Sequence, residues 1–175
     1  QKDPSWRVHV PAAAVSFCDG VYGRQEAYLP RACGDFVVRR ADGLYAYQLA
    51  VSVDDGMMGI THVLRGRDLL SSTAQQIWLI EYLGYPAPQY THVPMLIDGE
   101  GRRLSKRQQG ITIESLRDGG ADRDSVLSYL AYKGGLVSER ARYPLEELAR
   151  RCDLTALRQE DIVVDDDVMQ AICAV

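Results

Sequence analysis

The sequence predicts an α/β fold in which a strand-helix-strand unit precedes a group of short helices. Residues 59–66 form a short apolar run bounded by glycines, which is typical of a buried strand in a parallel sheet. Helical spacing follows over residues 71–84, and a second strand-like run occupies residues 91–97. After Gly110 the apolar residues recur at helical spacing among arginines. Together these observations predict a βαβ unit with an appended helical part.

The composition is that of a globular protein with a modest acidic excess. Its 175 residues, 46% of them hydrophobic, suffice for one domain with a small appendage. No apolar run approaches the roughly 18–20 residues that span a bilayer, so we expect no membrane partner and a cytoplasmic location. The net charge of −4 argues against wholesale coating of nucleic acid and leaves room for contacts through local arginine patches.

The four cysteines and three histidines are scattered along the chain without a CxxC pair. We therefore expect no zinc site in this segment, and buried or half-buried thiols instead. The chain begins at Gln1, which is compatible with a piece of a longer protein.

The first part of the chain predicts short strands. Residues 1–34 read as loops with an edge strand at Trp6–Val10. A further strand is expected over residues 35–40, closed by a turn at residues 41–43.

The middle of the chain contains one segment that the pattern leaves undecided. Residues 45–53 are apolar on both the helical and the strand period, and Asp54-Asp55-Gly56 is expected to end them. In the βαβ unit, Ser71-Ser72-Thr73 is expected to cap the helix and Gly84 to end it.

The C-terminal part predicts helices with ordinary start and stop signals. Asp122 or Asp124 is expected to cap one helix and Gly134-Gly135 to stop it, while Pro144 suits the first turn of another helix over residues 145–152. We accordingly expect two domains, residues 1–110 and residues 111–175.

A basic loop, Arg102-Arg103-Leu104-Ser105-Lys106-Arg107, follows the turn-forming residues 98–101. Lys106 is one of only three lysines in the chain, and a lysine inside an arginine cluster suits a phosphate that moves during reaction. The alternative is a solvated basic loop. The chain has no GxxxxGK[ST] or GxSxG motif, and Leu104 interrupts a GxGxxG pattern, so the common nucleotide-loop and hydrolase motifs do not apply.

Three ordered motifs make the sequence resemble the catalytic core of glutamyl-tRNA synthetases. They are residues 43–55, residues 58–70 and residues 103–107, within a resemblance that extends over roughly residues 35–135. The Leu-Tyr-Ala-Tyr-Gln-Leu-Ala wording at residues 44–50, and Arg-Asp-Leu-Leu at residues 67–70, are closer to the glutamyl-Q tRNA(Asp) synthetases, which are short paralogues of that family.

The resemblance implies a class I synthetase fold. The chain would supply the second half of the Rossmann-like nucleotide-binding domain and a small helical stem-contact-like subdomain. The residues that match the family's ATP-binding signature loop are Arg103, Leu104, Ser105, Lys106 and Arg107, with Lys106 as the catalytic, ATP-binding lysine. Tyr47 and Arg65 match the positions that bind glutamate.

The implied reaction is ATP-dependent activation of L-glutamate with Mg²⁺, followed by transfer of the glutamyl group to tRNA, with queuosine of tRNA(Asp) as the expected acceptor. No general base is needed to activate a carboxylate, so positioning and cationic stabilisation should dominate. The family's His-x-Gly-His signature and the zinc-binding cysteines of many short paralogues are absent from these 175 residues. We therefore expect a C-terminal fragment that needs the N-terminal half of the catalytic domain and is inactive alone.

Two other functions remain open from the sequence. One is a fragment of an ordinary glutamyl-tRNA synthetase that charges tRNA(Glu), and the other is a non-catalytic module that binds tRNA or a protein partner. Structural interpretations also exist for the individual residues. Arg65 would then cap a strand end, Tyr47 would belong to the core, Asp54 and Asp55 would be solvated, and the two Thr-His-Val triplets would be similar strand starts.

Overall fold

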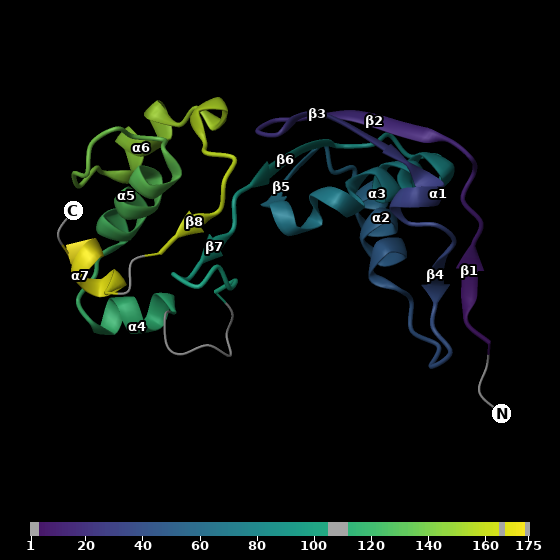
Figure 1. Cartoon of the computed structure of the whole chain (residues 1–175), viewed down its shortest axis with the longest axis horizontal. Coiled ribbons are helices and arrows are strands. Elements are labelled where there is room, and N and C mark those ends of the chain that lie inside the picture. The colour runs from purple at the N-terminus through teal and green to yellow at the C-terminus, as the bar shows by residue number, and fades with distance from the viewer. Residues whose placement is uncertain (1–3, 105–111, 165–166, 174–175) are drawn as a thin grey trace. The chain divides into compact units, whose positions relative to one another are not determined.

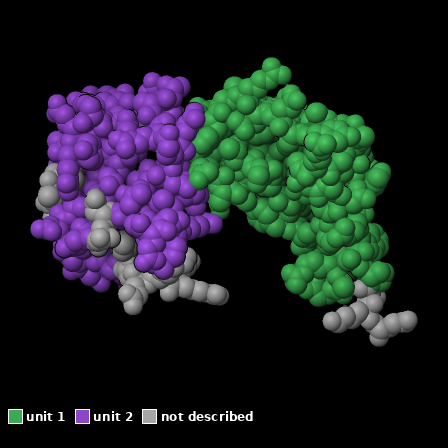
Figure 2. Space-filling view, viewed as in Figure 1, with its two compact units in different colours: residues 1–92 green, residues 93–175 purple. Residues whose placement is uncertain are grey.

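The computed structural model describes residues 4–104, 112–164 and 167–173 (Figure 1). Its contacts divide the chain into two compact units, residues 1–92 and residues 93–175 (Figure 2). The sequence predicts a boundary between two domains near residue 110. The compact units do not test that boundary, which stays a prediction. Each unit has its own strands, helices and buried side chains.

Unit 1 begins with two antiparallel strand pairs. Strand β1 (Trp6–Val8) pairs with β4 (Phe36–Arg39), and β2 (Ala14–Asp19) pairs with β3 (Gly23–Tyr28). The expected strands near residues 6–10 and 35–40 are therefore present. The β2-β3 hairpin was not expected. Exposed positions alternate with half-buried or buried ones along both of its strands, as in a sheet with one face toward the protein. The short helix α1 (Leu29–Ala32) follows the hairpin directly.

Helix α2 (Tyr47–Met58) settles the segment that the pattern left undecided. The expected end at Asp54-Asp55-Gly56 is wrong, since the helix continues to Met58 and stops at Gly59, whose φ of 65° is left-handed. Gly56 is tolerated inside the helix because the Tyr85 ring packs directly against its backbone. A Cβ built on Gly56 would lie 2.5 Å from Cδ2 of Tyr85.

The βαβ unit is confirmed as β5 (His62–Gly66), α3 (Leu70–Tyr82) and β6 (Gln89–Val93), with a 3₁₀ turn at Arg67–Leu69. The starts of β5 and β6 lie side by side, because the backbone N–H of Gln89 donates to the carbonyl oxygen of Thr61 at 2.9 Å. The expected helix end at Gly84 is also confirmed by its φ of 87°.

Two details of the βαβ unit differ from expectation. The N-cap of α3 is Leu69, and the hydroxyls of Ser72 and Thr73 donate to Leu69 O, so they satisfy a carbonyl instead of capping a backbone N–H. The run over residues 91–97 is not one strand, because β6 ends at Val93 and β7 (Leu96–Ile97) begins after Pro94, which has no N–H for a ladder.

Helix α3 provides much of the buried apolar surface of unit 1. Its inward face is almost fully buried, and Leu29 from α1 is buried completely; the residues are Leu29, Ala74, Ile77, Leu79 and Ile80. Polar Thr73 and Gln76 lie on the same buried face, so they require hydrogen-bond partners within the protein.

Unit 2 is mainly helical, with α4 (Ile113–Asp118), α5 (Arg123–Gly134), α6 (Leu145–Arg151), α7 (Val168–Cys173) and a 3₁₀ turn at Leu154–Ala156. Strand β7 pairs in parallel with β8 (Ile162–Val163).

The expected cap of α5 is confirmed at Asp122, whose Oδ1 accepts from the backbone N–H groups of Asp124 and Ser125. Gly135 ends α5 with a left-handed φ of 84°. Pro144 is the N-cap of α6, one residue before the position expected for it.

A separate apolar cluster stabilises unit 2. Its buried members come from α4, α5, α7 and the residues after β8: Leu116, Tyr129, Val164, Val168, Ala171 and Ile172. Among the described residues no helix is long and apolar enough to cross a membrane. The expectation of buried thiols is wrong for Cys18 and Cys152, which are exposed, and holds for Cys33, which is half-buried.

Candidate functional site

Arg65, near the end of β5, is held by uncharged acceptors on three sides. Its Nε donates to Nε2 of His92 at 2.9 Å, and Nη1 donates to Oε1 of Gln76 at 2.6 Å. Nη2 donates to Oγ1 of Thr73 at 2.7 Å and more weakly to Leu69 O at 3.4 Å. Four of the five guanidinium N–H groups can be assigned to these bonds, which leaves at most one for a ligand.

The charge of Arg65 is half-buried and has no direct counter-ion among the described residues. Burial lowers the pKa of the guanidinium, and the neighbouring Tyr90, Tyr47 and Asp55 partly oppose this effect. The guanidinium lies over the Tyr90 ring, 4.9 Å from its centroid, which is a favourable cation-π geometry. A half-buried cation whose hydrogen-bond acceptors are all uncharged favours the binding of an anion.

His92 and Asp19 form a fully buried pair behind Arg65. Nδ1 of His92 lies 2.6 Å from Oδ2 of Asp19, and both side chains have 0% exposure. Burial raises the pKa of Asp19, but hydrogen bonds from Tyr22 N, the His92 ring, Val21 N and His92 N outweigh it, so the net pKa is lowered. Asp19 therefore remains a carboxylate inside the protein.

The sequence interpretation of the two Thr-His-Val triplets missed this pair. His62 is exposed, in agreement with an ordinary strand start, whereas His92 lies inside the protein and contacts Arg65. The sequence signal that could have indicated burial of His92 is the alternation along β6. Tyr90 and His92 are two residues apart and therefore share one face of the strand, and both are buried between exposed or half-buried neighbours.

Tyr47 begins α2, and its side chain is 56% exposed. It is not a core residue, and its hydroxyl is near enough to influence the pKa of Arg65. Gln76 also links the two positions, because its Nε2 donates to Oε1 of Gln48 at 2.6 Å while its Oε1 accepts from Arg65. The structure thus brings Tyr47 and Arg65 into one neighbourhood of unit 1.

Asp55 is not in a solvated turn, contrary to the structural interpretation of the two aspartates. It lies on α2 and is half-buried, and burial raises the pKa of its carboxyl group despite the attraction of Arg65. Asp54, one residue earlier, is exposed.

The base of the basic loop is held by its own acidic turn. Arg102 pairs with Asp98 at 2.9 Å and with Glu100 at 2.6 Å, and Asp98 N donates to Arg102 O. Arg102 is therefore engaged within the protein, and the turn expected at residues 98–101 is present.

The signature-loop residues are only partly covered by the structure. Arg103 is exposed and forms a β-bridge with Ile97. Leu104 is half-buried against the apolar cluster of unit 2, and its N–H donates to Leu96 O at 3.1 Å, so it anchors the start of the loop. Ser105, Lys106 and Arg107 lie outside the described residues.

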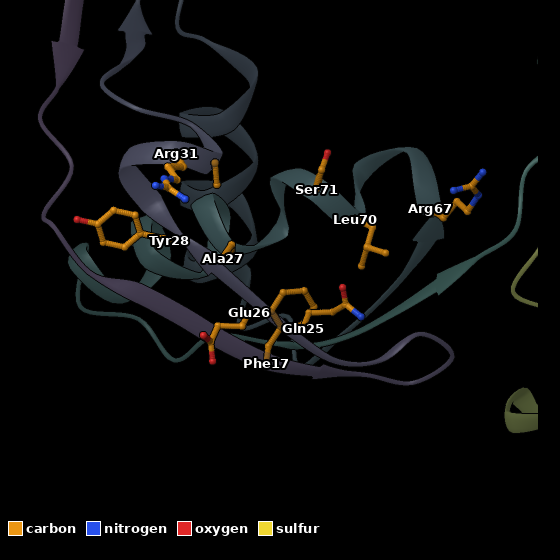
Figure 3. A pocket seen from close by; sticks show the side chains of 11 residues that line it. Phe17, Gln25, Glu26, Ala27, Tyr28, Arg31, Arg67, Leu70 and Ser71 are labelled. Atoms are coloured by element: carbon orange, nitrogen blue, oxygen red, sulfur yellow. The ribbon is translucent and has the colours of Figure 1, made fainter.

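A separate cavity of 660 Å³ lies between the β2-β3 hairpin, α1 and the start of α3 (Figure 3). Its polar lining includes Glu26, Arg31 and Ser71, and Phe17 contributes an apolar wall. Neither Tyr47 nor Arg65 lines this cavity, so it is separate from the candidate glutamate-binding residues.

No group of three or more histidine, cysteine or acidic side chains is placed to hold a metal ion within the part of the chain that the structure describes.

The comparisons with known proteins identify the class of fold first. A crystal structure of a glutamate tRNA ligase from Elizabethkingia meningosepticum, in complex with its amino acid, superposes with a TM-score of 0.77 and 22% sequence identity. The match covers 95% of this chain and 37% of that one. The fold is therefore the α/β, Rossmann-like fold of class I synthetases, as the sequence predicted.

The sequence comparisons then identify the family. Residues 1–171 match the family model of class I tRNA synthetases (E and Q), catalytic domain. The glutamyl-Q tRNA(Asp) synthetase of Symbiobacterium thermophilum is 43% identical over 171 residues, which are 98% of this chain and 53% of the relative. That of Geobacter sulfurreducens is 53% identical over 118 residues, 67% of this chain and 38% of the relative.

The chain belongs to the class I tRNA synthetases of the E and Q group, and it spans about half the length of the curated relatives that it matches. The resemblance read from the three sequence motifs to the aminoacyl-tRNA synthetase family is thereby confirmed.

Proposed function

We propose that this chain is part of a ligase that activates L-glutamate with ATP and transfers the glutamyl group to tRNA, with queuosine of tRNA(Asp) as the acceptor. The observation that carries the proposal is the half-buried cation of Arg65, which faces uncharged acceptors and retains at most one N–H for a ligand. The names of the relatives in Symbiobacterium and Geobacter support the choice of acceptor.

In this proposal one carboxylate oxygen of glutamate attacks the α-phosphorus of ATP, and the bond to the bridging oxygen breaks. The products are glutamyl adenylate and pyrophosphate, and the acceptor hydroxyl then displaces AMP from the glutamyl group. Binding and orientation supply most of the rate enhancement in such a step.

Arg65 and Tyr47 are the proposed glutamate-binding residues. The remaining N–H of Arg65 would make one charge-assisted bond to a carboxylate, worth about 1.5–3 kcal/mol. Tyr47, exposed at the start of α2, would orient the substrate through its hydroxyl.

The signature loop, Arg103 to Arg107, is the proposed ATP-binding segment, with Lys106 as the cation that stabilises charge on the transferring phosphoryl group. Leu104 supports this assignment, since its anchorage in the apolar cluster holds the start of the loop while Arg103 stays exposed. ATP would arrive with Mg²⁺ as its counter-ion, and the reaction would take place in the cytoplasm.

The remaining part of the active site is proposed to come from an N-terminal half of the catalytic domain. The relatives are about twice as long as this chain, which supports the proposal. We expect residues 1–175 alone to show no glutamate-dependent ATP-pyrophosphate exchange; exchange by this segment would contradict its dependence on another half.

The role of Arg65 is tested by Arg65→Ala in a protein that carries the whole catalytic domain. Loss of one charge-assisted bond should raise KM for glutamate by roughly 10–150-fold and leave KM for ATP nearly unchanged. Arg40→Ala, at an exposed arginine paired with Asp42, is the matched control and should change neither constant. Equal losses for glutamate and ATP would indicate misfolding and remove the support for a binding role.

The acceptor is tested by measuring glutamate transfer onto queuosine-containing tRNA(Asp) and onto tRNA(Glu). Transfer only to the first supports the proposal, and transfer only to the second assigns an ordinary glutamyl-tRNA synthetase. Binding of tRNA without any activation of glutamate would assign a non-catalytic module.

A further inference from the structure

We propose that Asp19 and His92 are positioning residues for Arg65, because they fix one neutral tautomer of His92 whose Nε2 lone pair orients the guanidinium. We call this chain of hydrogen bonds, from Asp19 through His92 to Arg65, the relay, and all three of its residues are described by the structure. Its consequence for substrate rests on the proposed role of Arg65 in binding glutamate.

The tautomer follows from the chemistry of the two partners of His92. A carboxylate only accepts hydrogen bonds, so Nδ1, which lies 2.6 Å from Oδ2 of Asp19, must carry a proton. Arginine only donates, so Nε2, which lies 2.9 Å from Nε of Arg65, must present a lone pair. His92 is therefore neutral, with its single proton on Nδ1.

Thr73 is consistent with this assignment. Its hydroxyl lies 3.2 Å from Nε2 of His92, but its proton goes to Leu69 O at 3.0 Å, and its oxygen accepts from Nη2 of Arg65 at 2.7 Å. The Nε2 lone pair thus remains available to Arg65.

The relay holds Arg65 without neutralising it. A carboxylate in direct contact with the guanidinium would form an ion pair that a substrate carboxylate would have to displace. Here the Asp19 charge is separated from Arg65 by an uncharged imidazole ring, much as outer carboxylates orient the histidine ligands of metal ions. Arg65 keeps its orientation and its charge for a ligand.

The backbone places Asp19 behind His92 through a close approach of β2 and β6. Gly20 N donates to Tyr90 O at 3.0 Å, and a Cβ on Gly20 would collide with the Thr91 side chain. His92 N also donates to Asp19, at 3.1 Å from Oδ2, so the carboxylate is bound to the backbone and the ring of the same residue.

The variant Asp19→Asn should reverse the tautomer. Oδ1 of Asp19 accepts from Val21 N and Tyr22 N, so the asparagine oxygen is required on that side and its amide NH₂ must face Nδ1 of His92. The N–H of His92 loses Oδ2 as an acceptor and keeps the oxygen at the Oδ1 position, which lies 3.3 Å away. The amide then donates to Nδ1, and the ring proton moves to Nε2. The N–H groups of His92 Nε2 and Arg65 Nε then face each other as two donors, and the hydrogen bond between them is lost.

The first test is ¹⁵N NMR of the histidine rings in the 175-residue chain. We expect the wild-type protein to show one buried ring protonated on Nδ1, and Asp19→Asn to show that ring protonated on Nε2. Nδ1 of the exposed His9 also lies near a carboxylate, 3.1 Å from Oδ2 of Asp35, so the ring signals are assigned with His9→Gln and His62→Gln, which leave His92 as the only histidine. A wild-type ring protonated on Nε2, or on both nitrogens, would overturn the proposal.

The second test separates the two contacts of His92 by substitution in the protein that carries the whole catalytic domain. His92→Gln can return an oxygen acceptor toward Arg65, whereas His92→Asn is shorter and can serve only Asp19. We expect KM for glutamate to rise about tenfold or more with His92→Asn and with Asp19→Asn, less with His92→Gln, and KM for ATP to stay constant. His62→Gln, at the exposed histidine of β5, is the matched control.

The outcomes distinguish this inference from the proposed function. If Arg65→Ala leaves KM for glutamate unchanged, the proposed role of Arg65 fails, whereas the NMR result still decides the tautomer. If Arg65→Ala raises that KM but Asp19→Asn and His92→Asn do not, the positioning role is wrong and the proposed function stands. Equal losses with His92→Gln and His92→Asn would indicate a purely structural histidine.

Discussion

At the scale of single residues, Tyr90 carries a buried hydroxyl that has no hydrogen-bond partner among the described residues. Its side chain is 2% exposed, and burial raises the pKa of the phenol to about 12, against the attraction of Arg65 and with the added repulsion of Asp55. An unsatisfied buried hydroxyl destabilises the folded state.

We expect Tyr90→Phe to raise the free energy of unfolding of this chain by about 1 kcal/mol, because the substitution removes the unsatisfied group and keeps the ring under Arg65. Urea denaturation of both proteins measures the difference. Phe17→Leu, which alters the ring that packs edge-on against Tyr90 at 6.2 Å, is a control for packing and should lower stability. A loss of stability in Tyr90→Phe would show that the hydroxyl is satisfied in solution.

At the residue scale, the sequence motifs point to Arg65 and Tyr47 as candidates and give no sign of Asp19 or His92. The first two belong to motifs in which neighbouring residues and spacing carry the information. Asp19 and His92 are 73 residues apart and lie in segments without a recognisable motif, so only the approach of β2 to β6 reveals the pair.

At the scale of elements, α2 shows how a glycine inside a helix is used for packing. Gly56 has an ordinary helical backbone, and the Tyr85 ring occupies the space where a side chain would begin. A glycine at this place weakens the isolated helix relative to alanine and permits contact with the loop after α3.

We expect Gly56→Ala to destabilise the chain by about 1–3 kcal/mol, because the new methyl group overlaps a ring that belongs to a packed loop. In the background of Tyr85→Ala the same substitution should be neutral or stabilising, since the clash is gone and alanine favours the helix. Thermal unfolding of the wild-type protein, the two single variants and the double variant gives the coupling free energy between the two positions. Additive effects in this cycle would show that Tyr85 does not pack on Gly56.

The elements that the sequence predicted well are those with local signals. The strand at β5, the helix end at Gly84 and the cap at Asp122 depend on neighbouring residues. The segment at residues 45–53 was undecidable, because its apolar residues satisfy both periods and the choice of a helix depends on burial against α3, which packs beside α2.

At the scale of the whole molecule, the two compact units have separate apolar cores. Unit 1 buries the inward face of α3 with Leu29, and unit 2 buries Leu116 and Ile172 among its helices. Each unit therefore has the means to retain its structure when the core of the other is weakened.

We expect Leu116→Ala to lower the stability of unit 2 by about 2–5 kcal/mol, because the substitution opens a cavity beside Ile172 and Tyr129. Native-state hydrogen exchange should then show faster exchange for amides of α5 and α7 and unchanged exchange for amides of α3. Leu145→Ala, at a more exposed leucine of α6, is the control and should have a smaller effect. Equal acceleration in α3 would show that the units unfold together.

The sequence by itself determined the family and the glutamate-binding candidates, because the residues that match the family are grouped in short motifs with local spacing. Only the tertiary structure decided that Arg65 is clamped by uncharged acceptors with Asp19 and His92 behind it. The physical reason is that hydrogen-bond direction and burial depend on distant segments meeting in space, and no local pattern of residues specifies which donor will face which acceptor.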